Sequence, residues 1–330
     1  MGSLADLLSE STDNLSPLPW RRASAGIVLT IPTYLLAEYY FGELRDVING
    51  ANSLGFRAVV TLLAFAWLTP VAHAYHLRWT ATNVGALRTR FGVTPSQPVP
   101  SEVSIVPGVI GSAAFAMLFF GLPSLLEGRP PTPSVQLTFA IVAGVVFGWV
   151  GARLLVALVR DARRLTHLAR QIEEVDLLDP DSLAPFTQQG LAGTWLLILM
   201  LSLSSHLFIA PGEAAIGSGV MVTIILSAAA VVFTLPMTGV RQLVRQRKVE
   251  RLAELRAVIN PLARSIVQGA EKPLESARLE ALLALEQRLM QVREWPVDAA
   301  SWVRFGLFLL LGLGSWVGAA TVEMLMESYL

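Results

Sequence analysis

The sequence predicts an all-α membrane protein: a polytopic bundle of seven transmembrane helices, N-terminus inside and C-terminus outside, with a cytoplasmic antiparallel helical hairpin. Three observations support this fold. The 330 residues are 53% hydrophobic and only 15% charged, whereas a soluble domain is roughly 25% charged. Seven apolar stretches are each long enough to cross a hydrocarbon layer about 30 Å thick. The basic residues fall almost wholly in alternate connections between those stretches.

The predicted spans are helices because lipid cannot satisfy exposed backbone groups and because the runs lack the alternation of barrel strands. The first run follows Arg21 and Arg22 and ends at Glu38-Tyr39-Tyr40-Phe41, without the small-residue cleavage site of a signal peptide. We therefore expect residues 1–22 to be a cytoplasmic tail. The seven runs cover residues 23–42, 56–77, 103–126, 135–158, 190–210, 217–239 and 301–325.

The positions of the basic residues predict the orientation. Of 25 lysine and arginine residues, only Arg45, Arg57 and Arg129 lie in or beside the first, third and fifth connections. Cytoplasmic loops carry such an excess because positively charged loops resist translocation. The N-terminus and the even-numbered connections are therefore expected in the cytoplasm. Residues 301–330 are expected to form the seventh span and a short C-terminus outside.

Two cytoplasmic loops are expected within the six-helix region 23–239. Residues 78–102 contain Gly92 and three prolines and are predicted to form an irregular loop. Residues 159–189 are predicted to begin as a helix that continues out of the fourth span. This segment then becomes acidic over residues 173–181 and breaks at Pro180. The acidic residues lack the central glycine and distal glutamate of an EF-hand, so we interpret them as a solvated cap.

The connection 240–300 is long enough to form a substructure. Its first half carries a heptad-like apolar stripe, which Asn260-Pro261 should kink or restart. Residues 268–273 resemble a turn, and a second amphipathic helix is predicted over 274–294. Two such helices joined by a short turn should pair antiparallel. The stripe residues that we expect to dock a partner are Leu252, Leu255, Ile259, Leu282, Leu285 and Leu289.

Composition and motifs exclude several function classes. A net charge of zero argues against nucleic-acid binding, which requires a basic surplus. The chain has no cysteine, hence no disulfide, thiolate metal site or cysteine nucleophile. It also has no P-loop, dinucleotide fingerprint, His-Glu-x-x-His or Gly-x-Ser-x-Gly motif. We therefore expect neither catalytic residues nor a cofactor or metal.

Ionisable residues inside spans are the first candidates for function, because each is costly to place in lipid. Glu38 lies near the outer end of the first span, and His206 follows Ser202 and Ser205 in the fifth. Together they could line a polar path. Alternatively, Glu38 lies at the headgroup boundary, and the fifth-span residues form a hydrogen-bonded seam between helices.

Other features have weaker functional interpretations. His73 and His76 share one helix face, which could begin a metal or haem site but fits interfacial packing better. Basic residues in segment 241–256 could attract anionic lipid headgroups or simply set the topology. Gly314 and Gly318 have the spacing of close helix packing.

The C-terminal third resembles a group of uncharacterised polytopic bacterial inner-membrane proteins. The run Arg293-Glu294-Trp295-Pro296-Val297-Asp298 leads into Arg304-Phe305 and then Gly314-Ser315-Trp316-Val317-Gly318-Ala319-Ala320. An earlier similarity covers residues 175–179 and 183–186. The resemblance spans about residues 160–330. It implies a multi-pass protein of the bacterial inner membrane and brings no activity with it.

Three functions remain open. The leading hypothesis is a non-enzymatic scaffold or regulatory component whose hairpin, residues 241–295, docks a protein partner or a second copy. The runner-up is a channel or secondary transporter with a polar path near Glu38 and His206. An intramembrane enzyme acting on lipids ranks last, because paired acids and bases at one depth are scarce. Membrane lipid is a partner in each case.

Overall fold

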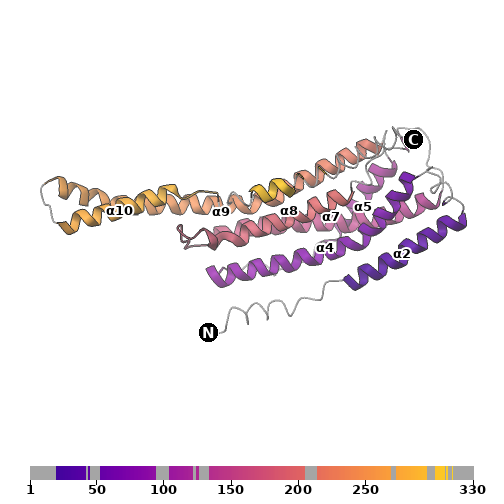
Figure 1. Ribbon diagram of the computed structural model, residues 1–330, viewed down its shortest axis with the longest axis horizontal. Coiled ribbons are helices and arrows are strands. Elements are labelled where there is room, and N and C mark those ends of the chain that lie inside the picture. The colour runs from indigo at the N-terminus through magenta and orange to yellow at the C-terminus, as the bar shows by residue number, and fades with distance from the viewer. Residues whose placement is uncertain are drawn as a thin grey trace.

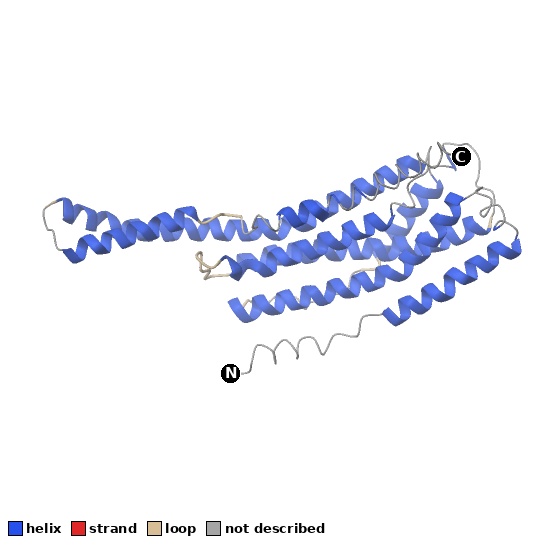
Figure 2. Cartoon of the chain, viewed as in Figure 1, coloured by secondary structure: helices blue, strands red, loops and turns tan. Residues whose placement is uncertain are grey.

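The structure is a computed structural model that describes residues 20–41, 44, 53–93, 104–121, 124–125, 134–204, 214–268, 273–295, 302–308, 310 and 314. Helices make up 92% of it and the described residues contain no strand, which confirms the all-α class (Figure 2). Three of the described helices are long and apolar enough to cross a membrane, over residues 55–91, 135–170 and 220–267. The chain therefore has the features of a membrane protein.

The helices form an elongated bundle around α7 (Figure 1). Helix α7 packs against α4, α5 and α9, while α8 packs against α4 and α9, and α2 packs on α4 and α7. The elements are α2 (Trp20–Phe41), α4 (Ser53–Phe91), α5 (Val106–Ala116), its π-helical continuation η1 (Met117–Gly121), α7 (Val135–Arg170), η2 (Pro180–Leu183), α8 (Ala184–Ser204), α9 (Ala214–Val267) and α10 (Pro273–Gln291).

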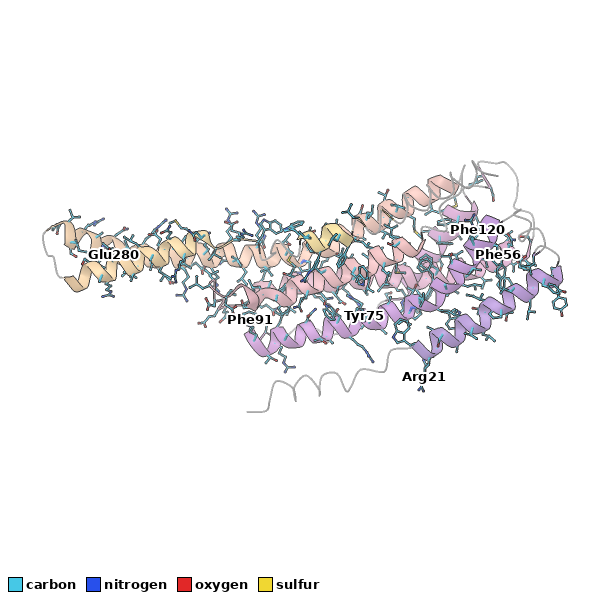
Figure 3. The ribbon with its side chains drawn as sticks, viewed as in Figure 1. Arg21, Phe56, Tyr75, Phe91, Phe120 and Glu280 are labelled. Carbon is cyan, nitrogen blue, oxygen red and sulfur yellow. The ribbon has the colours of Figure 1, made fainter. Side chains whose placement is uncertain are left out.

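The described ends of α2 and α4 that adjoin two of the basic segments lie toward the same end of the bundle. Arg21 marks the end of α2 nearer to the projecting helices α9 and α10, and Phe91 marks the corresponding end of α4 (Figure 3). Phe56 and Phe120 lie at the opposite end. We call the end from which α9 and α10 project the hairpin end.

Helix α4 corrects one prediction. Residues 78–91 are helical rather than an irregular loop, because Val84 and Leu87 continue the buried stripe of the preceding span. The helix ends at Phe91, just before Gly92. Gly92 adopts φ 65°, and its N–H donates to the carbonyl of Arg88 at 2.9 Å. Glycine accepts this left-handed conformation without strain. The glycine and the prolines thus mark the end of the helix, not its absence.

Helix α7 continues past the predicted span to Arg170, as expected for the start of the segment 159–189. Its first turn is capped by Ser134, whose hydroxyl accepts a hydrogen bond from the N–H of Leu137 at 3.0 Å. The chain leaves the helix at Gln171, and the short 3₁₀ turn η2 begins at Pro180.

Helix α9 is the longest element, with 54 residues, which corresponds to about 80 Å. It passes through Pro261 without ending, so the helix does not restart there. Helix α10 returns antiparallel along its far end (Figure 1). The pairing is held by Arg256 Nε bound to Glu286 at 2.7 Å and by Lys248 Nζ, which donates to the carbonyls of Met290 and Val292 at 2.7 and 2.9 Å.

Candidate functional site

A polar stripe runs along the face of α4 that points into the bundle. Thr69, His73, His76, Thr80 and Asn83 follow one another at spacings of 4, 3, 4 and 3 residues, which keeps them on one side of the helix. Four of them are at least 96% buried, His73 being partly exposed. Buried polar groups need hydrogen-bond partners, because an unmade bond costs the full desolvation of the group. His76, Thr80 and Asn83 find partners on α7 and α8, whereas Thr69 donates to the carbonyl of Phe65 in its own helix.

The centre of the site is a buried pair of ionisable side chains. His76 Nε2 lies 3.0 Å from Asp161 Oδ2 of α7, and both side chains are only 2% exposed. Arg164, one turn further along α7, places Nη1 3.5 Å from the second carboxylate oxygen. The carboxylate of Asp161 therefore lies between an imidazole and a guanidinium. An ionised carboxylate can only accept hydrogen bonds, so with Asp161 ionised the hydrogen of this contact is carried by His76 Nε2.

A second set of contacts extends from this pair to α8. Gln189 Nε2 donates to Thr80 Oγ1 at 2.8 Å, and Asn83 Nδ2 donates to Gln189 Oε1 at 2.8 Å. Thr80 Oγ1 is in turn 3.4 Å from His76 Nε2. The result is one continuous set of polar contacts, Asp161–His76–Thr80–Gln189–Asn83, which joins three helices. We call these five residues the buried polar chain.

Chemically, the buried polar chain can hold charge and hydrogen-bond donors inside the bundle, and it can change its hydrogen bonding if a proton is gained or lost. His76 Nδ1 is buried and has no hydrogen-bond partner among the described residues, so one nitrogen of the ring has no competing contact there. No group of three potential metal ligands occurs in the described part of the chain. The arrangement resembles the buried polar networks that hold packed helices in one relative position.

Sequence reasoning singled out His76 but missed Asp161 and Gln189. The signal for Asp161 was present. Leu154, Leu158, Asp161, Leu165 and Leu168 repeat at 4-3-4-3 spacing, so the carboxylate occupies a buried position of an apolar stripe. A charge in that register is costly without a partner, and a histidine on another helix is a suitable one.

Of the residues predicted to form a polar path, Glu38 is completely buried. Its neighbours Tyr39 and Tyr40 are 68% and 77% exposed, so the carboxylate faces the bundle and the tyrosines face outward. Ser202 donates to the carbonyl of Ile198 at 3.0 Å, a local bond within its own helix. Ser205 and His206 lie outside the described residues. A path from Glu38 to His206 thus stays a prediction.

The six residues predicted to dock a partner are mostly used within the hairpin. Ile259 and Leu289 are buried, and Leu252, Leu255 and Leu282 are half-buried, while Leu285 is 36% exposed. The apolar stripe therefore pairs α9 with α10. A side chain added at Gly314 would meet no atom within 4 Å among the described residues, and Gly318 lies outside them.

Comparison with known proteins adds no assignment: no protein-family model, no curated protein and no solved structure matches this chain.

Proposed function

We propose that this chain is a non-enzymatic, multi-pass protein of the bacterial inner membrane that serves as a scaffold or regulatory component. In this proposal seven helices cross the membrane, with the N-terminus in the cytoplasm and the C-terminus outside. The coiled-coil-like hairpin of α9 and α10 lies in the cytoplasm and docks a protein partner or a second copy through residues 241–295. The concentration of basic residues at the hairpin end supports this orientation.

The observation that carries the proposal is the continuity of α9. A single helix leads from the apolar bundle into the hairpin, so a change in the packing of its first half is transmitted to its second half. Exposed residues show the change of surroundings along it: Ile224 and Val231 are exposed in the first half, Arg251 and Glu254 in the second. Apolar exposure suits lipid, and charged exposure suits water.

Helix α9 packs closely against α7 near the buried polar chain. Thr166, little more than one turn beyond Asp161, donates to the carbonyl of Leu235 at 2.7 Å. A Cβ atom at Gly239 would lie only 2.8 Å from the carbonyl oxygen of Thr166, so glycine is required for this approach. Hydrogen bonding around His76 and Asp161 is therefore structurally connected to the helix that bears the hairpin.

The outer surface of the hairpin offers exposed apolar side chains between charged ones. Val249 and Val258 of α9 and Leu283 and Met290 of α10 are 44–62% exposed. Isolated apolar residues on a charged surface are common, and protein interfaces often use them with a polar rim. They are the positions through which we propose that the hairpin contacts its partner.

The proposal is tested by site-specific photo-crosslinking in intact bacterial cells. A photoreactive residue at Val258 or Leu283 should give an adduct of defined mass, containing either a second copy or one recurring protein. The matched control is Ile259, which is buried against α10 and should give none. Replacing residues 245–292 by a short glycine-serine linker should abolish the adduct while the spans remain inserted. Equal adducts at all three positions, or none, would overturn the proposal.

The burial of Glu38 favours one second candidate, a channel or secondary transporter. A carboxylate facing the bundle interior could bind a proton or cation on a path across the membrane. Flux of protons and small ions into liposomes tests this candidate: Glu38→Gln and His206→Ala should lower the flux, whereas Tyr39→Phe, an exposed neighbour, should not. Absence of flux in the unmodified protein would exclude the candidate for those ions.

A further inference from the structure

An apolar cavity of about 260 Å³ lies among α5, η1, α7, α8 and α9. It is on the side of the bundle away from the hairpin end, since its lining residue Phe119 directly precedes Phe120 (Figure 3). The described residues that line it are all glycine, alanine, leucine, isoleucine, phenylalanine or methionine. An apolar cavity of about 150 Å³ stays dry and is large enough to bind a benzene ring. This cavity therefore has room for a larger apolar group.

Glycines of α5 and α7 shape one wall of the cavity. Gly111 and Gly148 allow the two helices to touch: a Cβ atom at Gly111 would lie 2.3 Å from the carbonyl oxygen of Gly148, and one at Gly148 would lie 2.7 Å from that of Gly111. Gly151 is different, because a Cβ atom there would lie 3.7 Å from the ring of Phe147, an ordinary contact. The close crossing of α5 and α7 thus needs the first two glycines, whereas Gly151 contributes open volume to the cavity.

The remaining walls combine stiff and adaptable side chains. Phe115 stacks on Phe119 with ring centroids 4.4 Å apart and meets Phe147 edge-on at 5.7 Å. Met200 of α8 and Met221 of α9 also line the cavity, and methionine adapts to irregular apolar shapes. Phe119 belongs to the π-helical turn η1, a conformation that occurs frequently at functional sites. Such a lining suits a flexible apolar chain.

The cavity reaches the outer surface of the bundle between α5 and α9. Ala114 of α5 and Ile224 of α9 both line the cavity and are exposed. Their exposed neighbours Ile110 and Val220 are apolar as well. Because α7 and α9 are long and apolar enough to cross a membrane, this surface is in contact with lipid when the bundle is inserted. A hydrocarbon chain can then enter sideways from the bilayer.

We propose that this cavity binds one acyl chain of a membrane phospholipid. Bilayer and cavity are both apolar, so the chain is held by dispersion contacts with the surrounding side chains and not by the hydrophobic effect. Since no polar side chain is found among the described lining residues, the cavity selects the chain and not the headgroup. The proposal requires the helices to lie in a membrane, but it is separate from partner docking by the hairpin.

The test uses the full-length protein in vesicles of phosphatidylethanolamine and phosphatidylglycerol, with a trace of phospholipid that carries a photoreactive group in one acyl chain. After irradiation, peptide mapping should place adducts on Met200 and Met221, and also on the exposed Ile110. Gly151→Leu extends a side chain into the cavity. It should lower the Met200 and Met221 adducts about tenfold, because a second chain in the same space is overpacked, and leave the Ile110 adduct unchanged.

The matched control is Val142→Phe, which adds the same number of carbon atoms to the exposed surface of α7 and should change none of the three adducts. Should Gly151→Leu not fold, Met221→Trp fills the cavity from α9 and should lower the Met200 adduct in the same way. Adducts that persist in the variant that folds, or that are absent from the unmodified protein, would overturn the proposal.

A comparison of two headgroups tests which part of the lipid is recognised. The photoreactive chain is placed on phosphatidylethanolamine in one experiment and on phosphatidylglycerol in the other. Equal labelling of Met200 and Met221 supports recognition of the chain. Labelling that occurs with only one of the two lipids would assign the recognition to the headgroup and would contradict the proposal.

Discussion

The bundle and the hairpin both bury apolar residues but expose opposite kinds: apolar side chains in the bundle and charged ones in the hairpin. In the bundle, α2 and α5 expose Val28, Leu29 and Ile110 by more than 60%, while His76 and Asp161 are inside. In the hairpin, Ile259 and Leu289 are inside, and Arg251 and Glu254 are each 66% exposed. The exposed surface of the bundle therefore suits lipid, and the exposed surface of the hairpin suits water. The change occurs within a single helix, α9, near Val240 and Arg241.

This difference predicts unequal costs for disturbing polar contacts in the two regions. A charged pair buried among helices leaves an uncompensated charge when one partner is removed, whereas an exposed pair is replaced by water. Four substitutions in the full-length protein test this difference.

The largest effect is expected for Asp161→Ala. The substitution leaves His76 without its buried partner and should destabilise the protein by about 3 kcal/mol. Unfolding in mild detergent, followed by circular dichroism, measures the loss. The control is Glu280→Ala on the exposed surface of α10, which should change stability by less than about 0.5 kcal/mol. Equal losses of unfolding free energy in the two variants would show that the His76–Asp161 pair contributes no more to stability than a surface residue does.

Gly239→Leu should have the next largest effect. Its side chain would meet the backbone of Thr166, because even a Cβ atom lies 2.8 Å from that carbonyl oxygen. Overpacking of this kind costs about 1–3 kcal/mol, and α7 and α9 should move apart. Gly306→Leu is the matched control, since a Cβ there meets no atom of the described residues within 4 Å. Cysteine crosslinking between α7 and α9 should weaken in the first variant and stay unchanged in the second.

A charge reversal in the hairpin should have a smaller effect. Arg256→Glu places a second carboxylate beside Glu286 and should cost about 0.2–1 kcal/mol, because Arg256 is 54% exposed and solvent screens the pair, although Glu286 is only 15% exposed. Adding Glu286→Arg restores opposite charges and should recover the loss. Protease sensitivity of the hairpin, measured at low ionic strength, reports the change. Failure of the second substitution to rescue would mean that the two side chains do not interact in solution.

The smallest effect concerns the pH dependence of the hairpin surface. The hydrogen bond from Arg247, with a second from Gln246, holds the pKa of Glu250 below its ordinary value. A depressed carboxyl pKa stabilises the folded state above the unfolded pKa, and this contribution is lost as the pH falls through the folded pKa. Arg247→Gln should raise the Glu250 pKa, which NMR titration of the side-chain carboxyl would detect. An unchanged titration would contradict the contact.

Sequence periodicity predicted the helices well where apolar residues repeat without interruption. The extension of α7 and the pairing of α10 with α9 both follow from such repeats. The loop predicted over residues 78–102 was wrong over residues 78–91, because Gly92 and the prolines follow the end of a helix whose apolar register continues through Val84 and Leu87. Charge marks a boundary of the membrane, and a helix can continue beyond that boundary into water.

The candidate site was harder to predict because its members are far apart in the sequence. His76 and Asp161 are separated by 85 residues, so nothing local connects them. Each alone resembles an ordinary residue at the edge of a span. A polar residue in the buried register of one helix indicates that a partner exists, but only the packing of α4, α7 and α8 identifies that partner.

The close crossing at Gly239 has a mechanical consequence. From that crossing to the last residue of α9 is a rod about 40 Å long, so tilting it by roughly 5° would carry its tip through about 4 Å. A displacement of that size exceeds the reach of a hydrogen bond. A small repacking beside Thr166 would then be enough to shift the hairpin surface relative to the partner that we propose, without a large conformational rearrangement.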